Sequence, residues 1–170
     1  MGETMGKTGG ETGGDGRTTI EQRSDRELVV TRIFDGPVRL VFDAWTKADL
    51  FKLWWVPKSG GMNLKSCEMD VRTGGGYRLV FDLGEQGSMA FFGKYLEVVP
   101  LTRLVWTNDE GEEGAVTTVT FEEEDGKTRL VLREVYPSKE AFDAERGAEG
   151  ALPEQFDQLD ALLASLAASA

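Results

Sequence analysis

From residue 63 to residue 136, the chain consists of six segments rich in β-branched and aromatic residues, divided by short stretches of turn-forming residues. One divider is the pair Asp125-Gly126, and an Asp-Gly pair between two such segments is a strong signal for a β-hairpin. Consecutive strands with short links pair side by side, so the pattern predicts an antiparallel meander. The predicted strands are Asn63–Val71, Tyr77–Leu83, Ser88–Val99, Arg103–Asn108, Ala115–Glu123 and Thr128–Tyr136.

The end of the chain predicts a long amphipathic helix. Pro153 suits the first turn of a helix, where its missing N–H costs nothing. Before it, 138–146 also has helical character, and Gly147 and Gly150 interrupt the pattern. The uninterrupted helix is therefore expected from Pro153 to about Leu166. Its apolar residues recur every three or four positions and form one stripe, made of Leu152, Phe156, Leu159, Leu163 and Leu166, whereas Glu154, Gln155, Asp157 and Asp160 are expected to face elsewhere.

The start of the chain predicts a strand and two short helices. Glu27–Ile33 is rich in β-branched residues, as strands are. Two short helical segments follow before Pro57, the first with Val38, Val41, Phe42 and Trp45 at helical spacing, and the second with Leu50, Leu53 and Trp54. Residues 1–26 are rich in Gly, Thr and charge, so we expect a disordered tail there and a single domain over residues 27–168.

This order of elements predicts an α+β fold. An amphipathic helix and an antiparallel sheet each have one apolar face to bury, and packing them together buries both. We therefore expect a curved antiparallel sheet of six to seven strands around the long C-terminal helix, with two short helices after the first strand. The space beneath the helices then becomes a pocket.

Composition excludes several classes of function. The chain has no histidine, which removes Ser-His-Asp and Cys-His catalysis, histidine-ligated zinc and a histidine base. A net charge of −11 disfavours nucleic acid as a partner. No apolar run is long enough for membrane insertion, and Met1–Asp15 has no secretory apolar region, so we expect a cytoplasmic protein.

Two motifs that resemble ligand sites lack the necessary spacing. Thr73–Gly76 is rich in glycine but matches no phosphate-binding pattern, which favours a tight turn and predicts no nucleotide cofactor. Glu122–Asp125 is acidic but lacks the alternating ligands of a calcium loop, which favours a solvated hairpin tip and predicts no metal site.

Strand alternation selects the candidate site residues. Leu130, Leu132 and Glu134 share one face of their strand, so Glu134 points into the pocket if the leucines pack inward. A carboxylate there would orient or deprotonate a ligand; the alternative is a solvated or arginine-paired position at the end of the sheet. The same reasoning and the expected pocket mouth near Trp54-Trp55 give the full candidate lining: Trp54, Trp55, Tyr77, Leu79, Phe81, Phe91, Tyr95, Trp106, Asn108, Leu132, Glu134 and Phe156. For the aromatic residues, ordinary core packing is the competing interpretation.

Short motifs in a fixed order carry a family resemblance. These are the runs Arg32–Pro37, Val41–Thr46, Leu53–Pro57, Cys67–Gly75, Gly93–Pro100, Arg103–Thr107, Thr117–Phe121 and Thr128–Leu132. Together they resemble the family related to the activator of Hsp90 ATPase, within the helix-grip (Bet v 1/START-like) superfamily. The resemblance implies the helix-grip fold and a cavity for small molecules. The Hsp90 activator has a second, N-terminal domain, which we do not expect here, and the Gly-Trp pair that opens the last helix of many relatives reads Gly150-Ala151.

Three functions remain open. The first is a carrier or sequestering protein for a small apolar or aromatic molecule, as a monomer or homodimer. The second is a cyclase, dehydratase or hydrolase on a polyketide-like or aromatic substrate, with Glu134 or a tyrosine as the acid–base group. The third, which rests on the resemblance, is a protein-interaction domain in stress or chaperone pathways. The lack of any strong catalytic constellation favours binding over catalysis.

Overall fold

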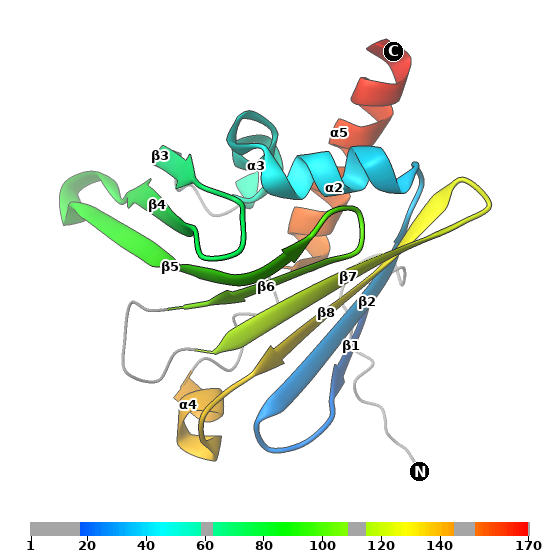
Figure 1. Cartoon of the computed structure of the whole chain (residues 1–170). Coiled ribbons are helices and arrows are strands. Elements are labelled where there is room, and N and C mark those ends of the chain that lie inside the picture. Colours follow the sequence, from blue (N-terminus) through cyan, green and yellow to red (C-terminus); the bar gives the residue numbers. More distant parts are fainter. Residues whose placement is uncertain (1–17, 59–62, 109–114, 145–151, 170) are drawn as a thin grey trace.

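A computed structural model describes residues 18–58, 63–108, 115–144 and 152–169 (Figure 1). Its strands are β1 (Thr18–Gln22), β2 (Glu27–Phe34), β3 (Asn63–Met69), β4 (Gly76–Asp82), β5 (Ser88–Val99), β6 (Arg103–Thr107), β7 (Val116–Glu124) and β8 (Lys127–Val135). Its helices are α2 (Val38–Thr46), α3 (Ala48–Trp54), α4 (Lys139–Ala144) and α5 (Leu152–Ser169), with a 3₁₀ turn η2 at Gly84–Gln86. The predicted α+β order of a strand, two short helices, a meander and a long helix is confirmed.

The strands form one antiparallel sheet in the order β1-β2-β8-β7-β6-β5-β4-β3. The sheet has eight strands, where six to seven were expected. The additional strand is β1, from the segment expected to be a disordered tail, which pairs with β2 in the register Thr18↔Arg32 to Gln22↔Leu28. Its β-branched start (Thr18-Thr19-Ile20) suits a strand, but the polar, glycine-rich sequence before it conceals that signal.

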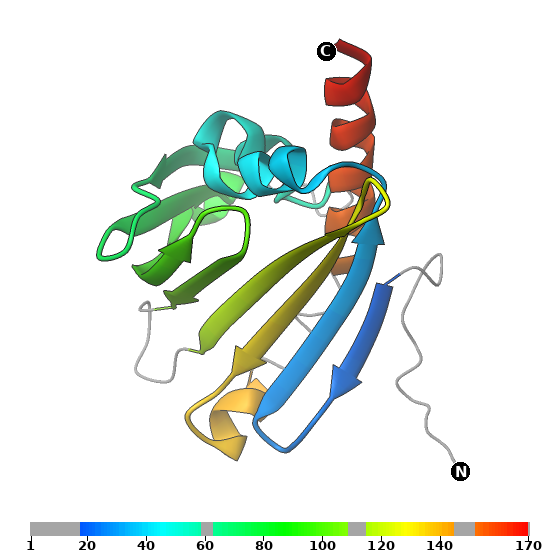
Figure 2. The ribbon, with the colours of Figure 1, turned by 45° about the vertical axis from the view of Figure 1, so that its right-hand side comes forward.

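Helix α5 lies beside one face of the sheet (Figure 2), and its apolar stripe is buried. Phe156, Leu159 and Leu163 are almost completely buried, as the predicted stripe requires, and Leu166 near the end of the helix is partly exposed. The ring of Phe156 meets that of Phe34 on β2 edge to face, with their centroids 5.4 Å apart. The predicted interruption at Gly147–Gly150 lies outside the described residues.

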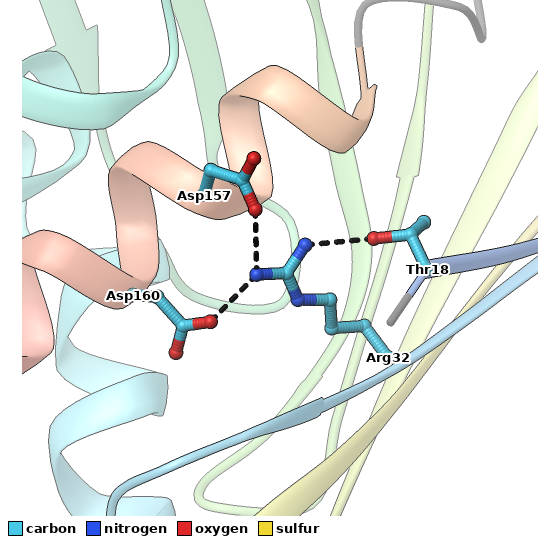
Figure 3. Close-up of polar contacts among 4 residues, drawn as sticks. All are labelled: Thr18, Arg32, Asp157 and Asp160. Carbon is cyan, nitrogen blue, oxygen red and sulfur yellow. Dashed lines mark hydrogen bonds and ion pairs between the residues drawn. The ribbon is translucent and has the colours of Figure 1, made fainter. Parts of the chain in front are cut away.

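A buried arginine ties α5 to the first two strands (Figure 3). The side chain of Arg32 on β2 is fully buried, and its Nη2 donates to Asp157 Oδ1 at 2.9 Å and to Asp160 Oδ2 at 2.6 Å. Its Nη1 donates to the hydroxyl of Thr18 on β1 at 2.8 Å. The expectation that Asp157 and Asp160 face away from the sheet is therefore wrong, because a buried guanidinium requires acceptors and these carboxylates supply them. We call these four residues the Arg32 clamp.

Helices α2 and α3 lie beside α5, with α2 against β7 and β8 and α3 against β3 (Figure 1). Trp45 on α2 and Trp54 on α3 are almost completely buried, and the indole N–H of Trp54 donates to the carbonyl of Ala44 at 2.9 Å. Phe51 and Trp54 form the buried face of α3, whereas Leu53, which was expected there, is 54% exposed. Residues three positions apart share a helix face, and Leu53 lies off the face that these two aromatic side chains set.

Among the described residues, no helix combines the length and apolar character that crossing a membrane requires.

Candidate functional site

A pocket lies under α2, α3 and the start of α5, against β3 to β6 and β8. Its cavity volume is about 90 Å³. This is a small volume, and we call the pocket the slot. The lining residues are Trp45, Phe51, Trp55, Met69, Tyr77, Leu79, Phe91, Tyr95, Trp106, Asn108, Leu132, Glu134 and Leu152.

Aromatic rings in mutual contact make up most of the pocket wall. The ring of Trp45 lies 6.0 Å from that of Trp106 and 6.1 Å from that of Trp55, measured between centroids. Trp106 in turn meets Tyr95 at 6.4 Å. Phe51 stacks on Trp55 at 4.8 Å, with only 26° between the ring planes. Offset and edge-to-face contacts of this kind hold aromatic side chains in fixed orientations, so the slot is preformed.

Two glutamines of α5 fix the segment that carries Trp55. The side-chain amide of Gln158 donates to the carbonyls of Trp54 at 3.0 Å and Val56 at 2.9 Å. The amide of Gln155 donates to the carbonyl of Trp55. Gln155 was expected to face away from the core, but it is buried because these carbonyls follow the last turn of α3 and need donors. Trp55 is thus positioned by both α3 and α5.

Glu134 is the charged side chain among the lining residues. It lies on the same face of β8 as the buried Leu132, as strand alternation predicts. Its Oε2 accepts a hydrogen bond from the Thr117 hydroxyl at 3.4 Å, and its Oε1 accepts one from the Tyr136 hydroxyl at 3.2 Å. These two contacts orient the carboxylate at the wall of the slot.

A row of directly paired residues crosses the sheet beneath the pocket. Glu134 on β8 pairs with Thr117 on β7, Thr117 pairs with Trp106 on β6, and Trp106 pairs with Tyr95 on β5. Directly opposed residues of an antiparallel sheet point to the same face, so all four side chains face the helices. Adjacent strands are spaced about 4.8 Å apart, so Glu134 and Tyr95 lie at the two ends of a row about 14 Å long between backbones.

Tyr95 carries a hydroxyl at the far end of this row. The side chain is only 5% exposed, and burial raises the pKa of its phenol, with a smaller contribution from Cys67. The hydroxyl therefore stays protonated at neutral pH. Among the described residues, none forms a hydrogen bond with it. A buried tyrosine usually finds such a partner, so this hydroxyl is available to a molecule in the pocket.

Two other polar side chains of the pocket, Tyr77 and Asn108, are engaged within the protein, whereas the buried indole N–H of Trp45 has no hydrogen-bond partner among the described residues. The hydroxyl of Tyr77 lies 2.7 Å from the carbonyl of Thr107 and 3.1 Å from Asn108 Oδ1. The amide of Asn108 donates to the carbonyl of Ala115 at 3.0 Å. A Cβ at Gly93 would lie 1.9 Å from the Thr107 oxygen and 2.9 Å from the Tyr77 hydroxyl, so only glycine permits this approach.

Nine of the twelve residues predicted for the lining border the pocket. The other three lie in the core: Trp54 and Phe156 are 0% exposed, and Phe81 is buried with its ring 5.3 Å from that of Phe91. Trp54 and Phe156 lie one helical turn from the lining residues Phe51 and Leu152, and Phe81 lies two residues from Leu79 on β4. The prediction missed Trp45, Phe51, Met69 and Leu152. The helical spacing of apolar residues identified Trp45 and Leu152 in the sequence, but as core residues.

The described residues hold no group of three or more Cys, Asp or Glu side chains that could bind a metal ion. Cys67 is half-buried, and burial raises the pKa of its thiol, so it stays protonated and weakly nucleophilic at neutral pH. The chemistry that the site offers is apolar enclosure, aromatic stacking, the Glu134 carboxylate, the Tyr95 phenol and the unpartnered indole N–H of Trp45.

Several proteins of known structure have the same fold as this chain. A protein of Rhodobacter sphaeroides with a crystal structure shares 24% identity with the chain, with a TM-score of 0.80 over 88% of this chain and 99% of that one. A Staphylococcus epidermidis protein shares 25% identity, with a TM-score of 0.73 over 86% of this chain and 93% of that one. An AHSA1-like protein from Aeromonas hydrophila shares 19% identity, with a TM-score of 0.62 over 79% of this chain and 93% of that one.

No match was found among curated proteins. The sequence profile of the family described as "Activator of Hsp90 ATPase homolog 1-like protein" matches residues 35–164, which is most of the chain and includes every residue that lines the pocket. The chain therefore belongs to the Activator of Hsp90 ATPase homolog 1-like family and has its helix-grip fold.

Proposed function

We propose that this protein binds a small apolar or aromatic molecule in the slot between α5, α2, α3 and the sheet. The observation that carries the proposal is the lining, in which seven of thirteen residues are aromatic and four more are Met or Leu. Small-molecule sites are typically concave, mostly apolar and equipped with a few placed polar groups. The Glu134 carboxylate and the Tyr95 hydroxyl fit that description.

Intrinsic tryptophan fluorescence provides a measurement of ligand binding. Three of the four tryptophans in the chain, Trp45, Trp55 and Trp106, line the pocket, so an aromatic ligand that enters should change the intrinsic fluorescence. Native mass spectrometry of the purified protein would first detect any molecule that co-purifies. A thermal-shift screen of neutral, cationic and anionic aromatic compounds and of apolar compounds would follow, with fluorescence titration of each hit.

A pair of methionine variants tests whether binding occurs in this pocket. Met69→Trp adds bulk to the lining, whereas Met89→Trp makes the same change at a position on β5 that is 40% exposed and outside the lining. The expected result is that M69W weakens binding of a hit at least tenfold and M89W leaves it unchanged. Equal affinity of both variants would place the ligand elsewhere. The absence of any co-purified molecule and of any hit would remove the proposal.

A second candidate function is acid–base catalysis in the same pocket. The supporting observation is the Glu134 carboxylate at the pocket wall, within hydrogen-bonding distance of the Tyr136 hydroxyl. Without histidine in the chain, such a carboxylate is a suitable general base. Glu134→Gln keeps the shape of the side chain and removes the base. If a substrate is found, this variant should lose most of its turnover; unchanged turnover would exclude Glu134 from the mechanism.

A further inference from the structure

Two hydrogen-bond donors in the slot have no acceptor within the part of the chain that the structure describes. One is the buried indole N–H of Trp45. The other is the hydroxyl of Tyr95, on a side chain that is almost completely buried. Buried polar groups in native proteins nearly always have a hydrogen-bond partner, because leaving a donor unpaired away from water costs free energy. Two unpaired donors in one pocket therefore favour a ligand that supplies the missing acceptor.

Both donors belong to side chains that contact the ring of Trp106. The ring centroid of Trp106 lies 6.0 Å from that of Trp45 and 6.4 Å from that of Tyr95. Trp106 also lines the slot and is only partly buried, unlike these two neighbours. A ligand ring that stacks on Trp106 therefore lies next to the side chains that carry both donors.

The acceptor side chains of the slot already contact hydroxyl groups of the protein. The Glu134 carboxylate accepts hydrogen bonds from two neighbouring hydroxyls, and Asn108 Oδ1 lies 3.1 Å from the Tyr77 hydroxyl. Burial raises the pKa of the Tyr95 phenol, which therefore keeps its proton and remains a donor at neutral pH. A neutral carbonyl oxygen suits such donors, because it accepts up to two hydrogen bonds and needs no counter-charge when it is buried.

The volume of the slot limits the ligand to one ring. An engineered apolar cavity of about 150 Å³ in another protein binds benzene, and the slot, at about 90 Å³, is smaller than that cavity. Resting on the proposed function above, we infer that the slot binds single-ring aromatic carbonyl compounds, such as aryl ketones and aldehydes. The ring stacks on Trp106, and the carbonyl oxygen accepts a hydrogen bond from the Tyr95 hydroxyl. The indole N–H of Trp45 is a second donor in the same slot.

Two compounds of the same shape test the inference. Acetophenone has the carbonyl oxygen, and α-methylstyrene has a CH₂ group in its place; both are uncharged, and the hydrocarbon is the more hydrophobic. Titrated by calorimetry, the protein should bind acetophenone at least as tightly as α-methylstyrene. Tyr95→Phe removes the donor and keeps the ring. It should weaken acetophenone binding about tenfold, because a buried acceptor is left unpaired, and keep the affinity for α-methylstyrene within about twofold.

The hydrocarbon is the matched control for Y95F, because it makes the same apolar contacts without using the hydroxyl. Tighter binding of α-methylstyrene than of acetophenone to the wild type would overturn the inference, and so would an unchanged acetophenone affinity in Y95F. An equal loss for both compounds in Y95F would come from altered packing and would also overturn it. If only hydrocarbons bind, carbonyl recognition fails and the binding pocket stands. If nothing binds at all, both proposals fail.

Discussion

The two halves of this helix grip differ in how completely they are filled. Around β1, β2 and α5, large side chains such as Phe34, Phe156 and Leu159 are 0–1% exposed, and the Arg32 clamp joins the elements. Around β3 to β6, Met69, Phe91 and Trp106 are only partly buried and border the pocket. We call these the closed half and the open half.

The difference shows how one fold combines a filled core with a ligand-sized slot. In the closed half, the stripe of α5 reaches the sheet and fills the space between them. In the open half, the rings of α2, α3 and β6 pack against one another and leave a slot between their faces and the sheet. The wall keeps its shape through aromatic contacts and through Gln155 and Gln158, without complete filling. Stability should therefore depend mainly on the closed half, and binding on the open half.

The largest expected effect comes from breaking the Arg32 clamp. Arg32→Met removes a fully buried guanidinium and leaves the carboxylates of Asp157 and Asp160 without it; the latter side chain is only 15% exposed. Removing one partner of a buried ion pair typically costs about 3–5 kcal/mol of unfolding free energy. Urea unfolding followed by circular dichroism would measure the loss.

A double variant separates the charge from the packing. Arg32→Met combined with Asp160→Leu replaces the ion pair with apolar side chains, which is often neutral or stabilising for buried pairs. It should recover much of the stability that Arg32→Met loses. A loss below about 1 kcal/mol in the single variant would show that the clamp does not hold the closed half together.

A matched pair of phenylalanine variants compares the two halves directly. Phe156→Ala opens a cavity in the closed half, and such changes typically cost about 3–5 kcal/mol. Phe91→Ala removes the same atoms from a side chain that already borders the pocket, so the loss should be smaller by about 2 kcal/mol. Chemical denaturation of both variants gives the comparison. Equal losses would mean that the open half is packed as tightly as the closed half.

The closed half and the sheet were largely predictable from periodicity. The spacing of Phe156, Leu159 and Leu163 is a property of the sequence alone, and so is the alternation that places Leu132 and Glu134 on one face. The Arg32 clamp was not predictable, because Arg32 and Asp160 are 128 positions apart and only the docking of α5 brings them together. β1 escaped prediction for a similar reason, since its pairing with β2 stabilises a segment of weak intrinsic preference.

The pocket was predictable strand by strand but not as a whole. Alternation selects Tyr77, Leu79, Phe91 and Tyr95, whose neighbours in sequence point to the other face. Which of two adjacent aromatic residues reaches the slot depends on sheet curvature and helix rotation, and local periodicity does not specify either. This is why Trp55 borders the pocket while Trp54 fills the core, and why Phe51 was missed.

The smallest expected effect comes from Tyr95 and concerns pH. Burial raises the pKa of this phenol in the folded state above its ordinary value of about 10. At a pH above about 10, the unfolded chain loses this proton while the folded protein keeps it, so the unfolding free energy falls as pH rises, by at most about 1.4 kcal/mol per pH unit for one group. Below pH 9 this contribution is constant.

Tyr95→Phe removes the titrating group and keeps the ring. Because the described residues form no hydrogen bond with the hydroxyl, the variant should match the wild type within about 0.5 kcal/mol at pH 7. Between pH 10 and 11.5, the unfolding free energy of the wild type should then fall relative to that of the variant. Urea unfolding at each pH measures both values. Other tyrosines and lysines titrate in both proteins and cancel in the comparison. Parallel stability curves would show that Tyr95 ionises in the folded protein, and that the open half admits enough water to solvate a phenolate.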